Sequence, residues 1–258
     1  MIGAIAGDII GSVYEFTDVK PEYDFPLFVD HSKFTDDTVL AVALADSIQN
    51  NIDYKTKMRE YYSLYPHCSY GGNFHQWASR IIDTPYNSWG NGSAMRVSPI
   101  GWAYNDIETV LEKAKQSAEI THNHPEGIKG AQATALAIYL SRMGTTKQEI
   151  KKEIEKRFNY NLNLDVEELR NNYSFNESCQ GTVPQAIFTF LVSDNFEDSI
   201  RKAIYIGGDS DTLACINGSI AEAYYKGVPK EIRDQVFLKL DTYLTKVVKE
   251  FENNFLRY

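Results

Sequence analysis

Two short acidic segments carry the clearest chemical signal in this sequence. Residues 34–38 read Phe-Thr-Asp-Asp-Thr, and about 170 residues later residues 207–212 read Gly-Gly-Asp-Ser-Asp-Thr. Each segment places two carboxylates and a threonine hydroxyl within five positions, directly before an apolar stretch with helical character. Hard oxygen ligands held at the start of a helix suit Mg²⁺, which prefers octahedral oxygen coordination.

The two segments together suggest more than either does alone. If they meet in the fold, four carboxylates converge on one point, and cations are needed to offset their mutual repulsion. For a single segment the alternative is an ordinary helix N-cap, because Asp, Ser and Thr favour that position. Repetition of the pattern favours a metal site.

A third segment, Gly90 to Arg96, combines small residues with the start of a predicted helix. Glycines allow a ligand to come close to the backbone, and free N–H groups at a helix start favour a phosphate or pyrophosphate. Arg96 could reinforce an anion there or support the loop from behind. A purely structural turn is the alternative, because Gly and Asn are common turn residues.

Two further side chains are candidates for a functional site. His122 is one of two histidines at a predicted helix start. Contact with substrate is favoured over zinc ligation, because no cysteine or third histidine lies at a suitable spacing. The alternative that His122 only belongs to an ordinary helix start stays open.

Glu15 lies seven residues after Asp8, near the same face of the first predicted helix. A carboxylate on an apolar helix is costly unless paired, so Glu15 is a candidate acid/base or metal-neighbouring group, with a solvated helix end as the alternative. Asp8 is expected to be structural.

The amino-acid composition is typical of a globular protein. The chain has 258 residues, 43% hydrophobic and 24% charged, and its net charge of −9 argues against general nucleic-acid binding. Its three widely spaced cysteines are expected to be reduced thiols. Asp8 interrupts the apolar N-terminal run and no basic residue precedes it, so no secretory signal is expected. No apolar run is long enough for a transmembrane helix. A cytoplasmic protein without membrane partners is expected.

Helical periodicity runs through nearly the whole chain and predicts one all-α domain spanning 1–258. No Gly/Ser- or Pro-rich linker divides it, and its many small residues in apolar helices suggest close helix–helix approach. Irregular structure is predicted at 17–34, 66–72, 83–92 and 158–176. Helices are predicted at about 2–13, 37–50, 53–64, 72–82, 92–103, 106–120, 125–143, 146–157, 178–193, 196–206, 211–225 and 230–250.

Five segments, taken together, resemble the ADP-ribosylglycohydrolase family, which includes the dinitrogenase reductase-activating glycohydrolases and the ADP-ribosyl-acceptor hydrolases. They occur in the family's order and extend from residue 2 to about residue 229. The matching segments are 3–15, 35–38, 90–96, 121–133 and 207–212.

The resemblance implies an all-α orthogonal bundle with a binuclear Mg²⁺ site at the bottom of a cleft, with Mn²⁺ as a substitute ion. It places Asp211 between the two ions, Glu15 near the metals, and Glu15 or Asp37 as the catalytic acid or base. The implied metal ligands are Thr35, Asp36, Asp37, Asp209, Asp211 and Thr212. The implied substrate-binding residues are Gly90, Asn91, Gly92, Ser93, Met95 and His122.

The implied activity is Mg²⁺-dependent hydrolysis of the glycosidic bond between ADP-ribose and an acceptor, with ADP-ribose or an ADP-ribosylated protein or small molecule as the partner. Arginine is the first expectation for the acceptor, and serine, a nucleobase and O-acetyl-ADP-ribose stay open. The chain is shorter than many members of the family, so the loops that shape acceptor specificity are expected to be shortened. Two alternatives remain: a catalytically silent ADP-ribose-binding module, and another Mg²⁺-dependent phosphate or nucleotide hydrolase. A monomer is expected, because no assembly segment is evident.

Overall fold

The computed structural model describes residues 1–15, 17 and 19–256, and confirms the predicted all-α fold. Within this part of the chain the only β pairing is an isolated antiparallel bridge between Gly90 and Ser178. None of the described helices combines the length and the apolar character needed to cross a membrane. The helices are α1 (Ile2–Gly11), α2 (Asp36–Asn50), α3 (Tyr54–Leu64), α4 (Gly72–Ala78), α5 (Gly92–Met95), α6 (Ser98–Ala103), α7 (Ile107–Glu119), α8 (Pro125–Arg142), α9 (Lys147–Phe158), α10 (Val166–Asn172), α11 (Cys179–Leu191), α12 (Phe196–Tyr205), α13 (Ser210–Tyr224), α14 (Lys230–Lys239) and α15 (Thr242–Phe255).

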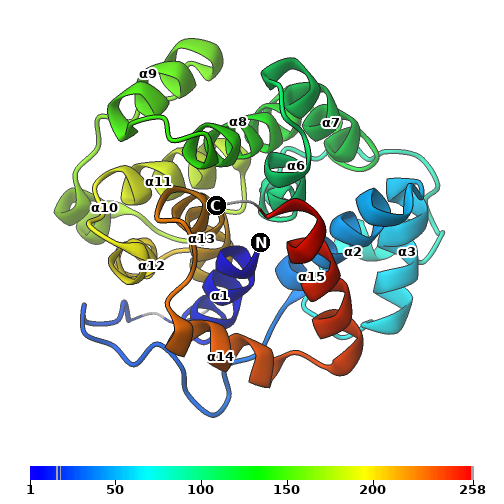
Figure 1. Cartoon of the computed structure of the whole chain (residues 1–258), viewed down its shortest axis with the longest axis horizontal. Coiled ribbons are helices and arrows are strands. Elements are labelled where there is room, and N and C mark those ends of the chain that lie inside the picture. Colours follow the sequence, from blue (N-terminus) through cyan, green and yellow to red (C-terminus); the bar gives the residue numbers. More distant parts are fainter. Residues whose placement is uncertain (16, 18, 257–258) are drawn as a thin grey trace.

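Helices α1 and α13 lie side by side at the centre of the molecule, and the other helices surround them (Figure 1). Every residue of α1 is buried, as is every residue of α13 from Ser210 to Ala223. A helix that is apolar on all sides is expected in a core rather than at a surface. Helix α13 also contacts α8, α11 and α12, so its N-terminus is held from several sides.

A stripe of glycines on α1 allows α13 to approach closely. Gly3, Gly7 and Gly11 recur at intervals of four and share one face of the helix. A Cβ at Gly7 would overlap the backbone carbonyl of Ala214, and a Cβ at Gly11 would lie 2.5 Å from the Cα of Asp211. The predicted close helix–helix approach is thus present, and it brings the end of α1 against the start of α13.

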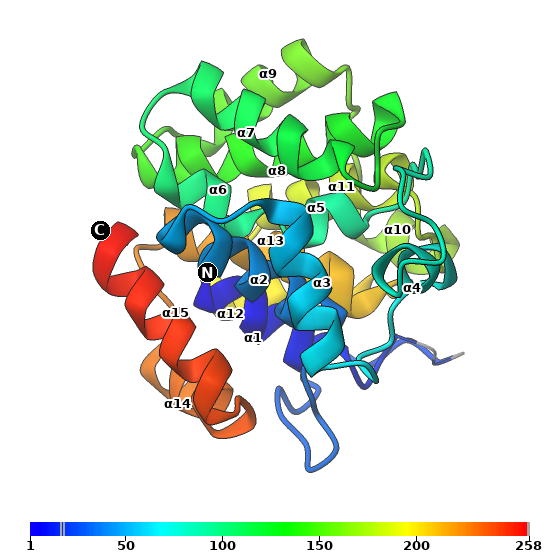
Figure 2. The same cartoon turned by 90° about the vertical axis from the view of Figure 1, so that its right-hand side faces the viewer.

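The remaining helices form the walls around this pair. Helices α7 and α8 pack together above it, α2 packs against α3 and α15, and α11 and α12 cover another side (Figures 1 and 2). Two helix N-termini, those of α2 and α13, open toward the same side of the bundle as the end of α1. The predicted acidic segments therefore occupy neighbouring helix starts.

Most predicted helices are present with ends within a few residues, but three predictions were wrong in detail. The predicted helix 92–103 is divided into α5 and α6, because Pro99 near the start of α6 has no N–H to continue the earlier turn. The predicted helix 230–250 is divided at Leu240, and Asp241 caps α15 by accepting from the Leu244 N–H. The stretch predicted as irregular at 158–176 contains α10, which Asp165 caps.

Candidate active site

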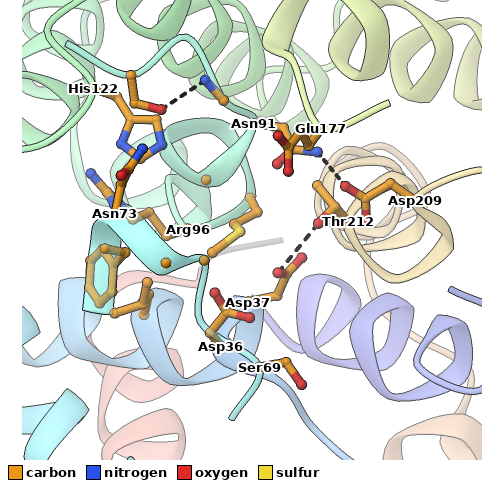
Figure 3. Close-up of a pocket in the computed structure, with 18 of the residues that line it drawn as sticks. Asp36, Asp37, Ser69, Asn73, Asn91, Arg96, His122, Glu177, Asp209 and Thr212 are labelled. Atoms are coloured by element: carbon orange, nitrogen blue, oxygen red, sulfur yellow. Dashed lines mark hydrogen bonds between the residues drawn. The ribbon is translucent and has the colours of Figure 1, made fainter. Parts of the chain in front are cut away.

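A cleft of about 510 Å³ lies where α1, α2 and α13 meet (Figure 3). One end is lined by carboxylates from the starts of α2 and α13 together with Glu15, which follows α1. The other end is lined by the loop around Gly90 and by Arg96 and His122. The cleft therefore has an acidic end and an end with a basic side chain.

Asp8 organises the acidic end from inside the protein. This fully buried carboxylate accepts hydrogen bonds from the backbone N–H groups of Thr35 (2.9 Å) and Thr38 (3.1 Å), and from both threonine hydroxyls. It thereby satisfies donors at the first turn of α2, which would otherwise lack partners. Burial raises the pKa of Asp8, while the four hydrogen bonds act in the opposite direction. Its expected structural role agrees with these contacts.

The first acidic segment presents two carboxylates to the cleft. Asp36 and Asp37 both line it, and Asp37 is almost fully buried. The Thr212 hydroxyl donates to Asp37 Oδ1 at 3.4 Å, whereas the buried Oδ2 of Asp37 has no hydrogen-bond partner among the described residues. Burial and the nearby charge of Asp8 raise the pKa of both carboxyls well above the usual range.

The second acidic segment joins Glu15. Oxygens of Glu15, Asp209 and Asp211 lie within 4.8 Å of one another. Burial, and then the charge of Asp209, raise the pKa of Glu15 to about 7; burial and Asp209 also raise the pKa of Asp211 well above its usual range. Gly207 and Gly208 both have positive φ, which aids the sharp turn that brings Asp209 to the cleft.

These contacts fit bound cations. A buried carboxylate oxygen without a donor is costly, and five acidic side chains whose proton affinities are raised by burial and mutual repulsion are stabilised by positive ions. The donors are carboxylates and a hydroxyl, which suit Mg²⁺ or Mn²⁺ better than a soft metal. The described residues therefore fit bound divalent cations, whereas the two-ion site that the resemblance implies and the assignment of individual ligands stay predictions.

Thr35 differs from the other predicted ligands. It is buried, its hydroxyl donates to Asp8 Oδ1 at 2.7 Å, and its oxygen accepts from the Asp37 N–H at 3.3 Å. It is the N-cap of α2 and does not line the cleft, whereas Thr212 does. Of the two segments, the structure brings Asp36, Asp37, Asp209, Asp211 and Thr212 together at the cleft surface.

The small-residue loop extends from the acidic end of the cleft to His122. Gly90, Asn91, Gly92 and Met95 line it. The Asn91 amide donates to Asp209 Oδ2 at 2.6 Å, so this side chain connects the loop to the acidic end. The Gly90 N–H donates to the Ser88 hydroxyl and the Asn91 N–H to the Glu177 carbonyl. These two groups, which precede the start of α5 at Gly92, are therefore already occupied, and the anion site predicted at the helix start stays a prediction.

Ser93 does not face the cleft. It is fully buried, and its hydroxyl donates to the Gly127 carbonyl at 2.7 Å. The side chain therefore joins the loop to the start of α8, and only its backbone is available for substrate binding. Its predicted part in substrate binding, through the backbone of the loop, stays a prediction.

Several cleft residues were not identified from the sequence. Ser69, Gly71, Asn73 and Phe74 come from the loop before α4 and the first turn of that helix, where Gly71 and Gly72 were the only signal available. The rim also carries three aromatic rings, of which Trp89 and Phe175 are exposed, and an acid that no local pattern indicated. These rim residues are Tyr86, Trp89, Phe175 and Glu177.

Comparisons with known proteins agree with this arrangement. The ADP-ribosylglycohydrolase family model matches residues 1–256. The chain is 28% identical to the ADP-ribosylhydrolase ARH3 of Bos taurus over 87% of this chain and 83% of the relative. It is 24% identical to the ADP-ribosylarginine hydrolase Tri1 of Pseudomonas putida over 92% of this chain and 72% of the relative. A solved ADP-ribosylglycohydrolase-related protein complex has the same fold, with a TM-score of 0.71 at 21% identity, over 97% of this chain and 96% of that chain.

Proposed function

This chain belongs to the ADP-ribosylglycohydrolase family, and from that premise we propose that it hydrolyses the glycosidic bond between ADP-ribose and an acceptor. The observation that carries the proposal is the convergence of Glu15, Asp36, Asp37, Asp209 and Asp211 at one end of a cleft of about 510 Å³. ARH3 and Tri1 are named as hydrolases of ADP-ribosyl groups, and their similarity over most of this chain supports the same activity here.

The reaction consumes water and yields free ADP-ribose and the acceptor. The oxygen of water forms a bond with the anomeric carbon of the ribose, the bond from that carbon to the acceptor breaks, and the acceptor takes a proton. When bound, two Mg²⁺ ions would orient the ribose hydroxyls and make water a stronger nucleophile at neutral pH. Glu15, or Asp37 in its place, accepts the proton that water loses, because both carboxylates line the same end of the cleft.

We propose arginine as the acceptor, on two grounds. Tri1 is named an ADP-ribosylarginine hydrolase. In addition, Arg96 is the only lysine or arginine among the described residues that line the cleft, against five carboxylates from Glu15, Asp36, Asp37, Asp209 and Asp211. The acidic end thus favours a cationic guanidinium group over a neutral acceptor.

The test is release of ADP-ribose from ADP-ribosyl-arginine and ADP-ribosyl-serine peptides of the same sequence. Each is assayed with Mg²⁺, with Mn²⁺ and with EDTA, and the products are identified by mass spectrometry. Intact ADP-ribose released from the arginine peptide, with Mg²⁺ or Mn²⁺ and not with EDTA, is expected. Preference for the serine peptide would overturn the acceptor assignment, and release of AMP or inorganic phosphate would show a phosphate hydrolase instead.

A pair of variants connects the activity to the cleft. Asp211→Asn keeps the size of the side chain and removes its charge, and it should abolish turnover. Asp234→Asn is the matched control, because Asp234 is exposed on α14 and pairs only with Lys230 at the surface. Full activity of Asp211→Asn in the presence of EDTA would contradict the two-ion mechanism.

A further inference from the structure

Arg96 is a buried cation at the basic end of the cleft. Its side chain is fully buried and lines the cleft, and burial lowers its pKa to about 10. One terminal nitrogen, Nη2, donates to the Ser117 carbonyl at 2.9 Å and to the Thr121 hydroxyl oxygen at 2.8 Å. Its Nε and Nη1 atoms have no hydrogen-bond partner among the described residues. A buried charge without a paired carboxylate calls for an anion nearby.

The bond from Arg96 occupies one of the two lone pairs of the Thr121 hydroxyl, and the side chains of His122 and Tyr86 are its other hydrogen-bond neighbours. A guanidinium only donates, so the Thr121 oxygen accepts from it and keeps its own proton for another partner. His122 Nδ1 lies 2.8 Å from Thr121 Oγ1 and is within reach of that proton. With Thr121 as donor, Nδ1 is the acceptor nitrogen of the imidazole, and a neutral ring then carries its proton on Nε2.

His122 Nε2 lies directly beside the loop at Gly90 and Gly92. The side chain is only 5% exposed and lines the cleft (Figure 3). A Cβ would lie 3.0 Å from Nε2 if built on Gly92 and 3.5 Å from it if built on Gly90. Glycine at both positions therefore leaves this nitrogen uncovered. Burial and the charge of Arg96 hold the pKa of His122 well below its usual value, so the ring is neutral.

We propose that Arg96 and Thr121 are positioning residues that hold His122 as its Nε2–H tautomer, so that Nε2 donates to a phosphate oxygen of ADP-ribose beside Gly90 and Gly92. The ligand in this inference rests on the proposed function, whereas the tautomer does not. The unpaired charge of Arg96 favours the diphosphate at this end of the cleft, and the carboxylates at the other end disfavour it there. The relay Arg96–Thr121–His122 thus presents the ligand with an uncharged hydrogen-bond donor, the Nε2–H of His122, whose orientation is fixed.

The tautomer is tested in the ligand-free protein by NMR of ¹⁵N-labelled histidine, with His122 assigned from an His122→Gln sample. The expected result is an unprotonated Nδ1 and a protonated Nε2. Thr121→Val keeps the size of the side chain but removes the hydroxyl, so His122 should lose its preference for the Nε2–H tautomer. Thr121→Ser is the matched control, in which this tautomer preference should be retained. A protonated Nδ1 in the wild type, or an unchanged Nε2–H tautomer in a folded Thr121→Val protein, would overturn the relay.

The ligand contact is tested by titrating ADP-ribose into the Mg²⁺-loaded protein while following the His122 signals and the heat of binding. Binding should shift the Nε2 resonance, and Thr121→Val should bind about tenfold more weakly than Thr121→Ser, as expected for one lost hydrogen bond to a charged group. Binding that leaves the Nε2 signal in place would overturn the contact while the proposed function stands. Absence of any ADP-ribose binding to the wild type would overturn both the proposed function and the contact between His122 and the phosphate. The roles of Arg96 and Thr121 would then still be tested by the tautomer measurement in the ligand-free protein.

Discussion

At the scale of single residues, the carboxylates of the cleft divide into two groups by their hydrogen bonds. Asp8 has four donors and holds the start of α2. Asp37 keeps one buried oxygen without a partner, and Glu15 lies within reach of Asp209 and Asp211. Hydrogen bonds satisfy Asp8, whereas Asp37 keeps an oxygen that is available to the proposed ions. This difference separates a structural acid from those proposed to act in the reaction.

Replacing Glu15 by glutamine should lower kcat by roughly 10²–10⁴-fold, the range for loss of a general acid or base. The change keeps the shape of the side chain but removes its ability to take a proton. The measurement is steady-state release of ADP-ribose at saturating Mg²⁺. Glu22→Gln is the control, since the Glu22 carboxylate is 86% exposed. Equal kcat for the two variants would remove Glu15 from the proposed chemistry.

His122 should make the protein less stable at low pH. Burial and Arg96 hold its pKa well below the usual value in the folded state, whereas the unfolded chain takes up a proton near pH 6.5. Unfolding is therefore favoured as the pH falls below 6.5, and the stabilising contribution of the neutral ring is present above that pH.

Compared with His122→Gln, the wild type should lose about 1 kcal/mol more of its free energy of unfolding between pH 7 and pH 5.5. Urea unfolding of both proteins at the two pH values measures this difference. Parallel losses in the two proteins would show that His122 is protonated in the folded state.

At the scale of the elements, the contact between α1 and α13 positions the acidic end of the cleft. Gly3, Gly7 and Gly11 allow the two backbones to touch, and Gly11 contacts the same turn that carries Asp211. The helix starts of α2 and α13 then point their positive dipole ends toward the carboxylates. The geometry of the site is therefore a property of helix packing.

Gly7→Ala should destabilise the fold at the upper end of the ~1–3 kcal/mol typical of overpacking, because its Cβ would overlap the Ala214 carbonyl. Gly11→Ala should also displace Asp211 and so lower turnover and Mg²⁺ affinity together. Thermal unfolding and Mg²⁺ titration check both variants. Gly72→Ala is the stability control, because a Cβ there meets nothing within 4 Å; equal stability of all three would contradict the packing argument.

At the scale of the whole molecule, the fold surrounds a cluster of acids that burial and mutual repulsion make unfavourable by themselves. A cation that binds the folded state and not the unfolded chain adds to stability by mass action. The protein should therefore be more stable with divalent ions than without them.

At a Mg²⁺ concentration 100 times its dissociation constant, the free energy of unfolding should rise by about 2.7 kcal/mol for each independent site. Calorimetric unfolding with Mg²⁺ and with EDTA measures the shift in Tm. Asp211→Asn should abolish the shift and Asp234→Asn should retain it. An unchanged Tm in the wild type would show that the carboxylates are satisfied without ions.

Local signals in the sequence determined the helices and the chemical type of the site. Caps such as Thr35 and Asp106 and the capping box of Thr146 with Glu149 act within four residues, so they can be recognised without the fold. The repeated acidic segments likewise indicated a cation site. The divisions at Pro99 and Asp241 were also local signals, and they were missed within otherwise continuous helical periodicity.

Tertiary structure alone decided which of these residues act together. Asp37 meets Thr212 across 175 positions, and Asn91 reaches Asp209 across 118; such contacts arise from helix packing, which no local pattern encodes. The same holds for Ser93, whose hydroxyl turns inward to Gly127. It also holds for Arg96, whose burial against Thr121 directs His122 into the cleft. The sequence determined which groups could do chemistry, and packing decided where each one points, because burial and direction depend on neighbours far away in the chain.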